Sequence, residues 1–220
     1  MTDHLGQLTT TSYALLGQLA RRPWSTYELS KSMARNYNYF WPRAKSLLYR
    51  ELQRLASLGL VEGTDAPVGR RRRTIYAIKP AGRRALRAWM RTEPRTFALE
   101  FEGLLRVWLA PHGDREDLLR ALSRVEADAE QMLRVAGVIV PEYLEGSSPA
   151  QGEVHTRAFV VDFLARYAEL VRSWAARSRG VVESWHDLAS DGKVSEALET
   201  IRAAPRLEPR ETDRARFGAG

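Results

Sequence analysis

Residues 41–60, WPRAKSLLYRELQRLASLGL, decide the fold of the N-terminal half of the chain, because they predict one helix with two different faces. Pro42 suits the first position of a helix, and Gly59 suits the position just after its last turn. Between them an apolar stripe recurs at spacings of four, four and three residues. This spacing places the stripe on one side of the helix, against a core. Its members are Ala44, Leu48, Leu52 and Leu55.

The opposite face of this helix carries hydrogen-bond donors and positive charge, with Glu51 as an acid on its flank. Such a face fits the major groove of DNA, where Arg and Lys contact guanine edges and phosphates. A solvated amphipathic helix is the alternative, and it is the more common explanation for one such helix taken alone. The outer face consists of Arg43, Lys45, Ser46, Tyr49, Arg50, Gln53 and Arg54.

Two shorter helices are predicted before this one. The first covers residues 9–20 and begins with cap-type threonines, and the second begins after Ser25, which forms an S-x-x-E capping box with Glu28. An aromatic turn, NYNYFW, follows at residues 36–41. Two short helices and a longer one with a cationic outer face make a helix-turn-helix arrangement, in which the last helix reads DNA. The side chains predicted to face inward are Tyr13, Leu15, Leu16, Leu19, Leu29 and Met33.

A basic hairpin is predicted after the helix. Residues 60–62 and 74–78 have strand patterns, and the segment between them contains Gly63, Pro67 and Gly69, which favour turns. A run of four arginines alone is more often a solvated tract than a specific site. Beside a reading helix, however, it predicts a wing whose arginines contact phosphates or the minor groove. These arginines are Arg70, Arg71, Arg72 and Arg73.

The rest of the chain is helical in pattern. A fourth helix is predicted at residues 80–92, with Leu86, Trp89 and Met90 inward, and Pro94 marks a boundary. Further helices are predicted at 97–109, from the cap Asp114 to about 139, and at 153–188, with Pro141 and residues 146–149 in a loop. We therefore expect a winged-helix domain at 1–95, a helical domain at 96–190, and a short helix (194–201) with a flexible tail within 191–220.

The helix at 153–188 carries a longer apolar stripe than three helices can cover. This length predicts that the stripe packs against a second copy of the chain, giving a two-fold dimer. Packing within one chain is an equally good explanation of the stripe alone. The residues predicted to form the dimer are Val160, Phe163, Leu164, Tyr167, Leu170, Val171 and Trp174.

Charge is distributed unevenly along the 220 residues. Residues 1–95 hold 18 of the 34 Lys and Arg but only 6 of the 27 Asp and Glu, so they carry +12 and the remainder carries −5. This asymmetry predicts that only the first part meets a polyanion. The sequence has no cysteine, no apolar run long enough for a membrane span and no signal-like N-terminus, so a cytoplasmic protein without a membrane partner is expected.

The sequence resembles the PadR family of bacterial transcriptional regulators, in its larger, PadR/AphA-like subgroup. FWPRAKSLLYRELQRLASLGLVEG is similar to the family's reading helix, through Phe40, Trp41, Leu48, Tyr49, Glu51, Leu52, Leu55, Gly59, Leu60 and Val61. GRRRRTIYAIKPAGRRAL is similar to its wing and following helix, through Gly69, Arg70, Tyr76, Ile78, Gly82, Arg83 and Leu86. The resemblance covers residues 9 to about 190.

The expected fold is therefore mainly α: an N-terminal winged helix-turn-helix domain with a two-stranded wing, followed by an all-α C-terminal dimerisation domain. The resemblance implies a homodimer that binds a two-fold-related operator and represses transcription. At the positions where the subgroup tends to have S-H-x-Q, this chain has Ala44, Lys45, Ser46 and Leu47. Leu47 lies on the outer face and is therefore expected to contact a thymine methyl group. The predicted DNA contacts are Arg43, Lys45, Ser46, Leu47, Tyr49, Arg50, Arg54, Arg70, Arg71, Arg72 and Arg73.

The resemblance also implies release from DNA by a small aromatic or hydrophobic effector. The tryptophans could line its pocket, although tryptophans at helical spacing more often belong to a core. The five tryptophans in question are Trp24, Trp41, Trp89, Trp108 and Trp174.

Enzymatic functions are disfavoured, and no cofactor or metal is expected. His4, His112, His155 and His186 lack metal-ligand spacing, and no phosphate-binding loop or nucleophile elbow occurs. The other open possibility is a winged-helix module that binds a protein instead of specific DNA. That module would need apolar residues on the outer face, where only Leu47 qualifies.

Overall fold

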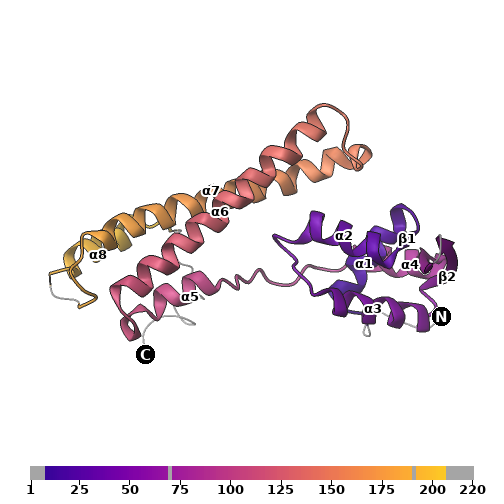
Figure 1. Ribbon diagram of the computed structural model, residues 1–220, viewed down its shortest axis with the longest axis horizontal. Coiled ribbons are helices and arrows are strands. Elements are labelled where there is room, and N and C mark those ends of the chain that lie inside the picture. The colour runs from indigo at the N-terminus through magenta and orange to yellow at the C-terminus, as the bar shows by residue number, and fades with distance from the viewer. Residues whose placement is uncertain (1–7, 69–70, 190–191, 207–220) are drawn as a thin grey trace. The chain divides into compact units, whose positions relative to one another are not determined.

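The computed structural model describes residues 8–68, 71–189 and 192–206, with the side chains of 66–68, 71 and 72 excepted. The chain divides into two compact units, Met1–Leu99 and Glu100–Gly220 (Figure 1). The predicted boundary near residue 95 lies close to this division. In the ranges described, no helix is both long enough and apolar enough to cross a membrane.

The described part of the first unit contains four helices: α1 (Thr10–Arg21), α2 (Thr26–Tyr37), α3 (Lys45–Ser57) and α4 (Pro80–Trp89). The predicted N-terminal caps of α1 and α2 are both present. The Thr9 hydroxyl accepts from the Ser12 amide at the start of α1, and Ser25 and Glu28 form a capping box at the start of α2. Such caps satisfy amide groups that have no partner within the helix, so these sequence signals fix where each helix begins.

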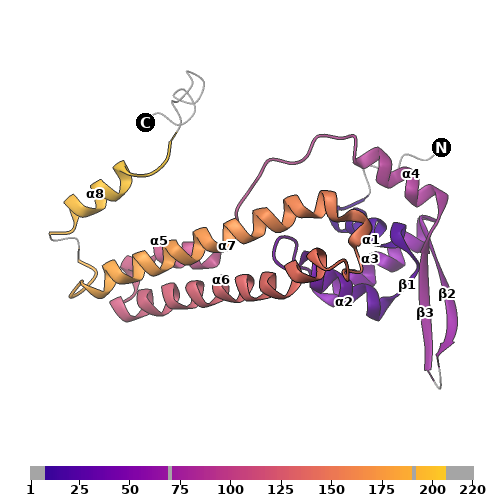
Figure 2. The same cartoon turned by 90° about the horizontal axis from the view of Figure 1, so that it is seen from above.

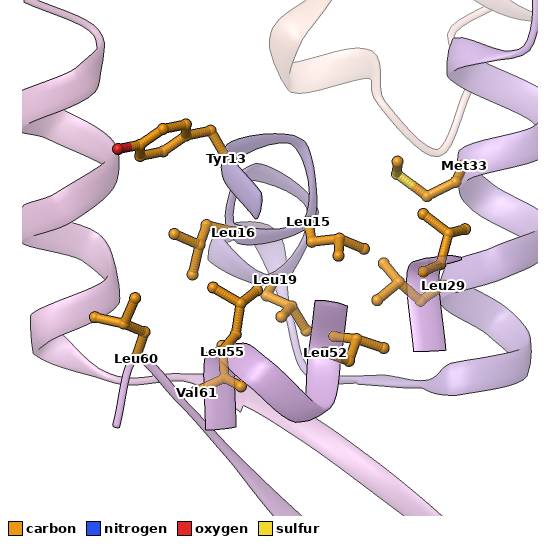
Figure 3. Packing of buried hydrophobic residues seen from close by; sticks show 11 residues of the cluster. Tyr13, Leu15, Leu16, Leu19, Leu29, Met33, Leu52, Leu55, Leu60 and Val61 are labelled. Carbon is orange, nitrogen blue, oxygen red and sulfur yellow. The ribbon is translucent and has the colours of Figure 1, made fainter. Parts of the chain in front are cut away.

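The core of the first unit lies between α1, α2 and α3, with the segment after α3 closing one side (Figure 3). Three members of the predicted stripe of α3, Leu48, Leu52 and Leu55, are buried. Each fully buried leucine of this kind contributes about 1.5–3 kcal/mol to stability. The inward side chains predicted from α1 and α2 are confirmed: Tyr13, Leu15, Leu16, Leu19, Leu29 and Met33.

The predicted start of α3 at Pro42 is wrong. Ala44, which we placed in the apolar stripe, is the exposed N-cap with extended backbone, and its carbonyl oxygen accepts the first helical hydrogen bond, from the Leu48 amide at 3.3 Å. The connection is instead held by the Trp41 amide, which donates to the Tyr37 carbonyl oxygen at 2.6 Å, and by the Arg43 guanidinium, which lies 4.2 Å from the centre of the Trp41 ring. These contacts keep Pro42 and Arg43 outside the helix.

The predicted end of α3 at Gly59 is confirmed. Gly59 has a φ of 68°, which glycine adopts without strain. The Gly59 amide donates to Ala56 at 2.9 Å and the Leu60 amide to Leu55 at 3.0 Å, the paired bonds of a Schellman motif. The motif turns the chain directly into the hairpin.

The hairpin is longer than predicted. It consists of β2 (Val61–Val68) and β3 (Arg71–Ile78), so Gly63 and Pro67, which we placed in a loop, lie within β2. Proline is tolerated because β2 is an edge strand. A Cβ at Gly63 would lie 3.0 Å from Thr74 Cγ2 and 3.2 Å from the ring of Tyr76 on β3, so the absence of a side chain relieves crowding between the two strands.

A third strand was not predicted. β1 (Trp24–Ser25) pairs antiparallel with β3, giving the sheet order β1-β3-β2. A strand of two residues is too short to show an alternation of apolar and polar side chains in the sequence. It is recognised only by its pairing with Tyr76 and Ile75 in the structure. β1 ties the start of α2 to the base of the wing.

α4 packs on α1 through Trp89, whose ring stacks on Tyr13 with the centroids 4.7 Å apart. Gly82 permits a close approach of α4 to the segment after α3, since a Cβ there would lie 2.3 Å from the Leu60 carbonyl oxygen. Met90 follows the last residue of α4 and is 69% exposed, so its predicted inward position is wrong.

Where it is described, the second unit contains helices and no strand, as predicted, but the helix bounds differ. The helix expected at 97–109 begins only at Glu102; Phe97 and Leu99 are exposed, and without a surface to cover it an apolar pattern does not maintain a helix. Pro141 lies inside the last turn of a helix and not in a loop. The elements are α5 (Glu102–Trp108), η2 (Ala110–His112), α6 (Arg115–Leu144), η3 (Gln151–Glu153), α7 (Val154–Glu183) and α8 (Val194–Arg202).

α6 and α7 form a long hairpin and lie side by side in both views (Figure 2). Asp114 caps the start of α6, as predicted. The neighbouring Arg115 donates to the carbonyl oxygens of Val182 and Glu183 at the end of α7, at 3.1 and 2.8 Å. The buried side chains of the hairpin are small or branched: Leu118, Leu122, Val125, Ala129, Ala168, Ala175 and Val182.

The capping box of α2 makes stability depend on pH. The Ser25 hydroxyl and amide donate to the Glu28 carboxylate at 2.7 and 2.9 Å and, with Arg22 and Arg73 nearby, hold the pKa of Glu28 below its usual value. The stabilisation is present above that usual value and is lost as pH falls through the lowered pKa. We expect Glu28→Gln to reduce the free energy of unfolding at pH 7 by about 0.5 kcal/mol, because solvent screens the partly exposed carboxylate.

Urea unfolding of both proteins from pH 7 to pH 2 measures this difference. It is expected to vanish at the acid end, where Glu28 is protonated in both folded and unfolded chains. A difference that stays constant over the whole range would contradict this role of the carboxylate.

Candidate nucleic-acid interface

The outer face of α3 lies opposite the buried leucine stripe. Lys45, Ser46, Arg50 and Gln53 are exposed, and Tyr49 is 48% exposed. These residues follow each other at helical spacing, so they form one continuous surface of donors and cations on a helix held by the core. Leu47, the predicted thymine contact, is half-buried at the edge of this surface.

The N-terminus of α3 adds to this surface. No side chain caps its first turn within the described residues, and the exposed Lys45 is its first residue. Uncapped amide groups at a helix start favour phosphate oxygens. Arg43 lies just before this turn, and its guanidinium donates to the Pro42 carbonyl oxygen at 2.7 Å while it covers the Trp41 ring.

Glu51 is a residue whose importance we did not predict. From the sequence it is an acid on the flank of the helix and one of the residues that resemble the family's reading helix. In the structure it is buried, and its Oε1 accepts from the hydroxyls of Ser12 and Thr9 and from Arg54 Nη1 at 3.3 Å. Arg54, a predicted DNA contact, is therefore ion-paired with a buried carboxylate. The signal in the sequence was an acid within a basic helix, combined with hydroxyl residues at the start of α1.

The wing arginines are only partly described. Arg70 lies outside the described residues, and Arg71 and Arg72 are described through their backbone in β3, with side chains outside that description. Arg73 is exposed and acts electrostatically on Glu28 at the start of α2. The arginine run thus continues along β3 instead of being confined to a loop.

The five tryptophans predicted to line an effector site are divided between the units. Trp24 donates from Nε1 to the Gln18 carbonyl oxygen at 3.0 Å, and Trp89 stacks on Tyr13. Trp41 is half-buried, and its Nε1 has no hydrogen-bond partner in the described part of the chain. Trp174 packs against the core of the second unit, whereas Trp108 is 82% exposed.

The residues predicted to form a dimer lie on α7. Phe163 and Leu170 are 58% and 61% exposed, and Val160 is also exposed. The Phe163 and Tyr167 rings stack with centroids 6.2 Å apart. Leu164, Tyr167, Val171 and Trp174 are half-buried. α7 therefore has two faces: one packs on α6 through Ala168, Ala175 and Val182, and the other leaves large apolar side chains in contact with solvent.

A comparison with known protein families finds a match within the first unit. Residues 15–88 match the family described as the transcriptional regulator PadR-like family. This match covers α3 and the hairpin, and it agrees with the resemblance seen in the sequence and with the interpretation that the chain is not an enzyme. No curated protein sequence matches the chain.

Solved structures share the fold. PadR from Bacillus subtilis in complex with operator DNA has a TM-score of 0.65 and 19% identity, covering 79% of this chain and 99% of that one. The same protein in complex with p-coumaric acid has a TM-score of 0.59 and 19% identity, covering 80% and 100%. AphA, a virulence activator of Vibrio cholerae, has a TM-score of 0.60 and 19% identity, covering 80% and 99%. The predicted fold class is thereby confirmed.

Proposed function

We propose, from the premise that the first unit belongs to the PadR-like family of transcriptional regulators, that this protein is a sequence-specific DNA-binding regulator that represses transcription as a homodimer. The observation that carries the proposal is the outer face of α3, where exposed donors and cations lie on a helix whose other face is fixed in the core. Such a helix can enter the major groove without unfolding.

Each predicted contact has its own role in this proposal. Lys45, Ser46 and Arg50 meet base edges and phosphates, since Arg and Lys bind guanine O6 and N7 or phosphate oxygens. Tyr49 and Arg43 contact phosphates, and Leu47 meets a thymine methyl group. The wing residues Arg70, Arg71, Arg72 and Arg73 follow the adjacent backbone or minor groove.

A homodimer supports this function because two reading helices related by a two-fold axis match a two-fold-related operator. The exposed apolar face of α7 supplies the surface for a second copy, since single chains rarely leave so many neighbouring large apolar side chains in water. We propose residues 1–95 as the DNA-binding domain, 96–190 as the dimerisation domain and 191–220 as a short helix with a flexible tail. A dimer bound across a promoter then blocks transcription.

Selection of bound duplexes from a random DNA library tests this function. We expect enrichment of one two-fold-related sequence with half-sites about 10 base pairs apart, one turn of DNA. A library that remains random after selection would contradict the proposal and would favour the alternative, in which the winged helix binds a protein.

Control by a small aromatic acid is a further part of the proposal. The B. subtilis relative is known in complex with p-coumaric acid. We expect p-coumaric acid or a related phenolic acid to quench tryptophan emission and to weaken DNA binding. The second effect requires the effector to bind the DNA-free protein more tightly than the DNA-bound protein. A fluorescence titration measures this, with Trp174→Phe and Trp108→Phe identifying which tryptophan responds. Unchanged emission over a panel of phenolic acids and lipophilic cations would contradict effector binding at these tryptophans.

A further inference from the structure

A buried carboxylate connects the DNA-facing helix to the start of α1. Glu51 lies on α3, and its side chain is only 9% exposed. Its Oε1 accepts three hydrogen bonds: from the Ser12 hydroxyl, from the Thr9 hydroxyl at 3.3 Å and from Arg54 Nη1 at 3.3 Å. A buried carboxylate is costly unless such donors replace its water, so these contacts define one preferred position for it.

The Thr9 and Ser12 hydroxyls are oriented by contacts that do not involve Glu51. The Thr9 amide donates to Ser12 Oγ at 2.9 Å, and the Ser12 amide donates to Thr9 Oγ1 at 3.2 Å, which together form the capping box of α1. A hydroxyl that accepts an amide proton still has its own proton to donate, and both hydroxyls lie within hydrogen-bond distance of Glu51 Oε1, with 3.1 Å between their own oxygens. The positive end of α1 also favours a negative charge at this point.

Arg54 joins this network from the DNA side. It lies three residues after Glu51, one turn further along α3, and its side chain is 39% exposed. The ion pair therefore joins a guanidinium on the predicted DNA surface to a carboxylate anchored on α1. Arginine has several donors in a fixed plane, so a contact with Glu51 orients the group without using all of them.

We infer that Glu51 is a positioning residue for sequence recognition: it fixes the rotation of α3 against α1 and aims Arg54 at the DNA. The inference rests on the proposed function, because it concerns how the same helix reads DNA. It assigns a function to a residue that does not itself touch DNA. The set of contacts joins Glu51, Ser12, Thr9 and Arg54.

Electrostatics and positioning predict opposite results when this charge is removed. A carboxylate on a helix that faces phosphates opposes DNA binding, so its loss alone should tighten binding to every duplex. Loss of positioning should instead weaken binding to the selected operator and leave binding to scrambled DNA unchanged or tighter. The sign of the change in operator affinity therefore separates the two effects.

Glu51→Gln tests the inference, with Glu62→Gln as the matched control. Glu62 is an exposed carboxylate on β2 of the same unit, so its replacement changes charge equally. Fluorescence anisotropy on the selected duplex and on a scrambled duplex should show that Glu51→Gln lowers operator affinity about tenfold, the loss expected for one charged hydrogen bond. Glu62→Gln should leave the operator affinity unchanged or raise it. Operator binding by Glu51→Gln that equals or exceeds the wild type would overturn the inference.

Two further measurements keep the test independent of folding. Circular dichroism and thermal melting establish whether Glu51→Gln and Thr9→Val are folded. Thr9→Val and Thr9→Ser provide a second pair at the exposed N-cap residue of α1. Thr9→Val should lower the ratio of operator to scrambled affinity about threefold, and Thr9→Ser should retain it, because serine still donates to Glu51. Equal ratios for the pair would count against the inference.

The double variant Glu51→Gln, Arg54→Ala completes the test. If Glu51 acts through Arg54, its replacement should cost at least threefold less affinity when Arg54 is already absent. Fully additive losses would contradict the route through Arg54. Failure of the wild type itself to discriminate the two duplexes would instead disprove the proposed function, so the two failures are distinct.

Discussion

Replacing Arg50 by alanine is expected to lower the affinity for the selected operator by about ten- to a hundredfold, the loss typical of one arginine that binds a guanine edge. Arg50 is exposed at the centre of the outer face of α3, between Ser46 and Gln53. Affinity for scrambled DNA should fall much less, because phosphate contacts dominate non-specific binding. Anisotropy titrations with both duplexes measure the two affinities.

Arg87→Ala is the matched control for Arg50→Ala. Arg87 is an exposed arginine in the same unit, but it lies on α4 and outside the predicted contacts. Removing Arg87 changes the net charge by as much as removing Arg50 does. Arg87→Ala should therefore lower the affinities for both duplexes by the same small factor. If the two variants lowered operator affinity equally, specific recognition by α3 would be contradicted.

Introducing negative charge on the exposed face of α7 should convert the proposed dimer to a monomer. The variant Phe163→Asp, Leu170→Asp would place two carboxylates against a second copy, where burial of unpaired charge is strongly unfavourable. Because the two half-sites act together, loss of the dimer should lower operator affinity about a hundredfold or more. Sedimentation equilibrium measures the mass, and anisotropy measures the affinity.

Ile201→Asp provides the control for the dimer. Ile201 is a large exposed apolar residue of the second unit, but it lies on α8 and outside the predicted interface. The variant should remain a dimer with unchanged affinity. A double variant that stays dimeric would contradict the interface on α7, whereas dissociation of both variants would extend it to α8.

The sequence predicted those features of the fold that depend on local chemistry. Ser25 and Glu28 fix the start of α2, Gly59 ends α3, and the leucines of α3 identify the side that faces the core. Features that depend on distant residues could not be predicted. β1 exists only through its pairing with β3, and Pro67 is accommodated because β2 is at the sheet edge.

The residues of the candidate site also divide into those that the sequence predicts and those that depend on distant contacts. Exposure of Lys45 and Arg50 follows from their position opposite the leucine stripe, and sequence spacing predicts it. The anchoring of Glu51 requires Ser12, which is 39 residues away in sequence. Contacts of this separation come from the packing of α1 on α3, and no periodicity within one helix reveals them.

Titration of the protein into the selected duplex and into a scrambled duplex, each at two salt concentrations, tests specific DNA recognition most directly. We predict that the selected duplex binds about a thousandfold tighter or more and that both affinities fall as salt rises, because cations on the protein release counterions from phosphates. Equal affinity for both duplexes at either salt concentration would contradict sequence-specific recognition by this protein.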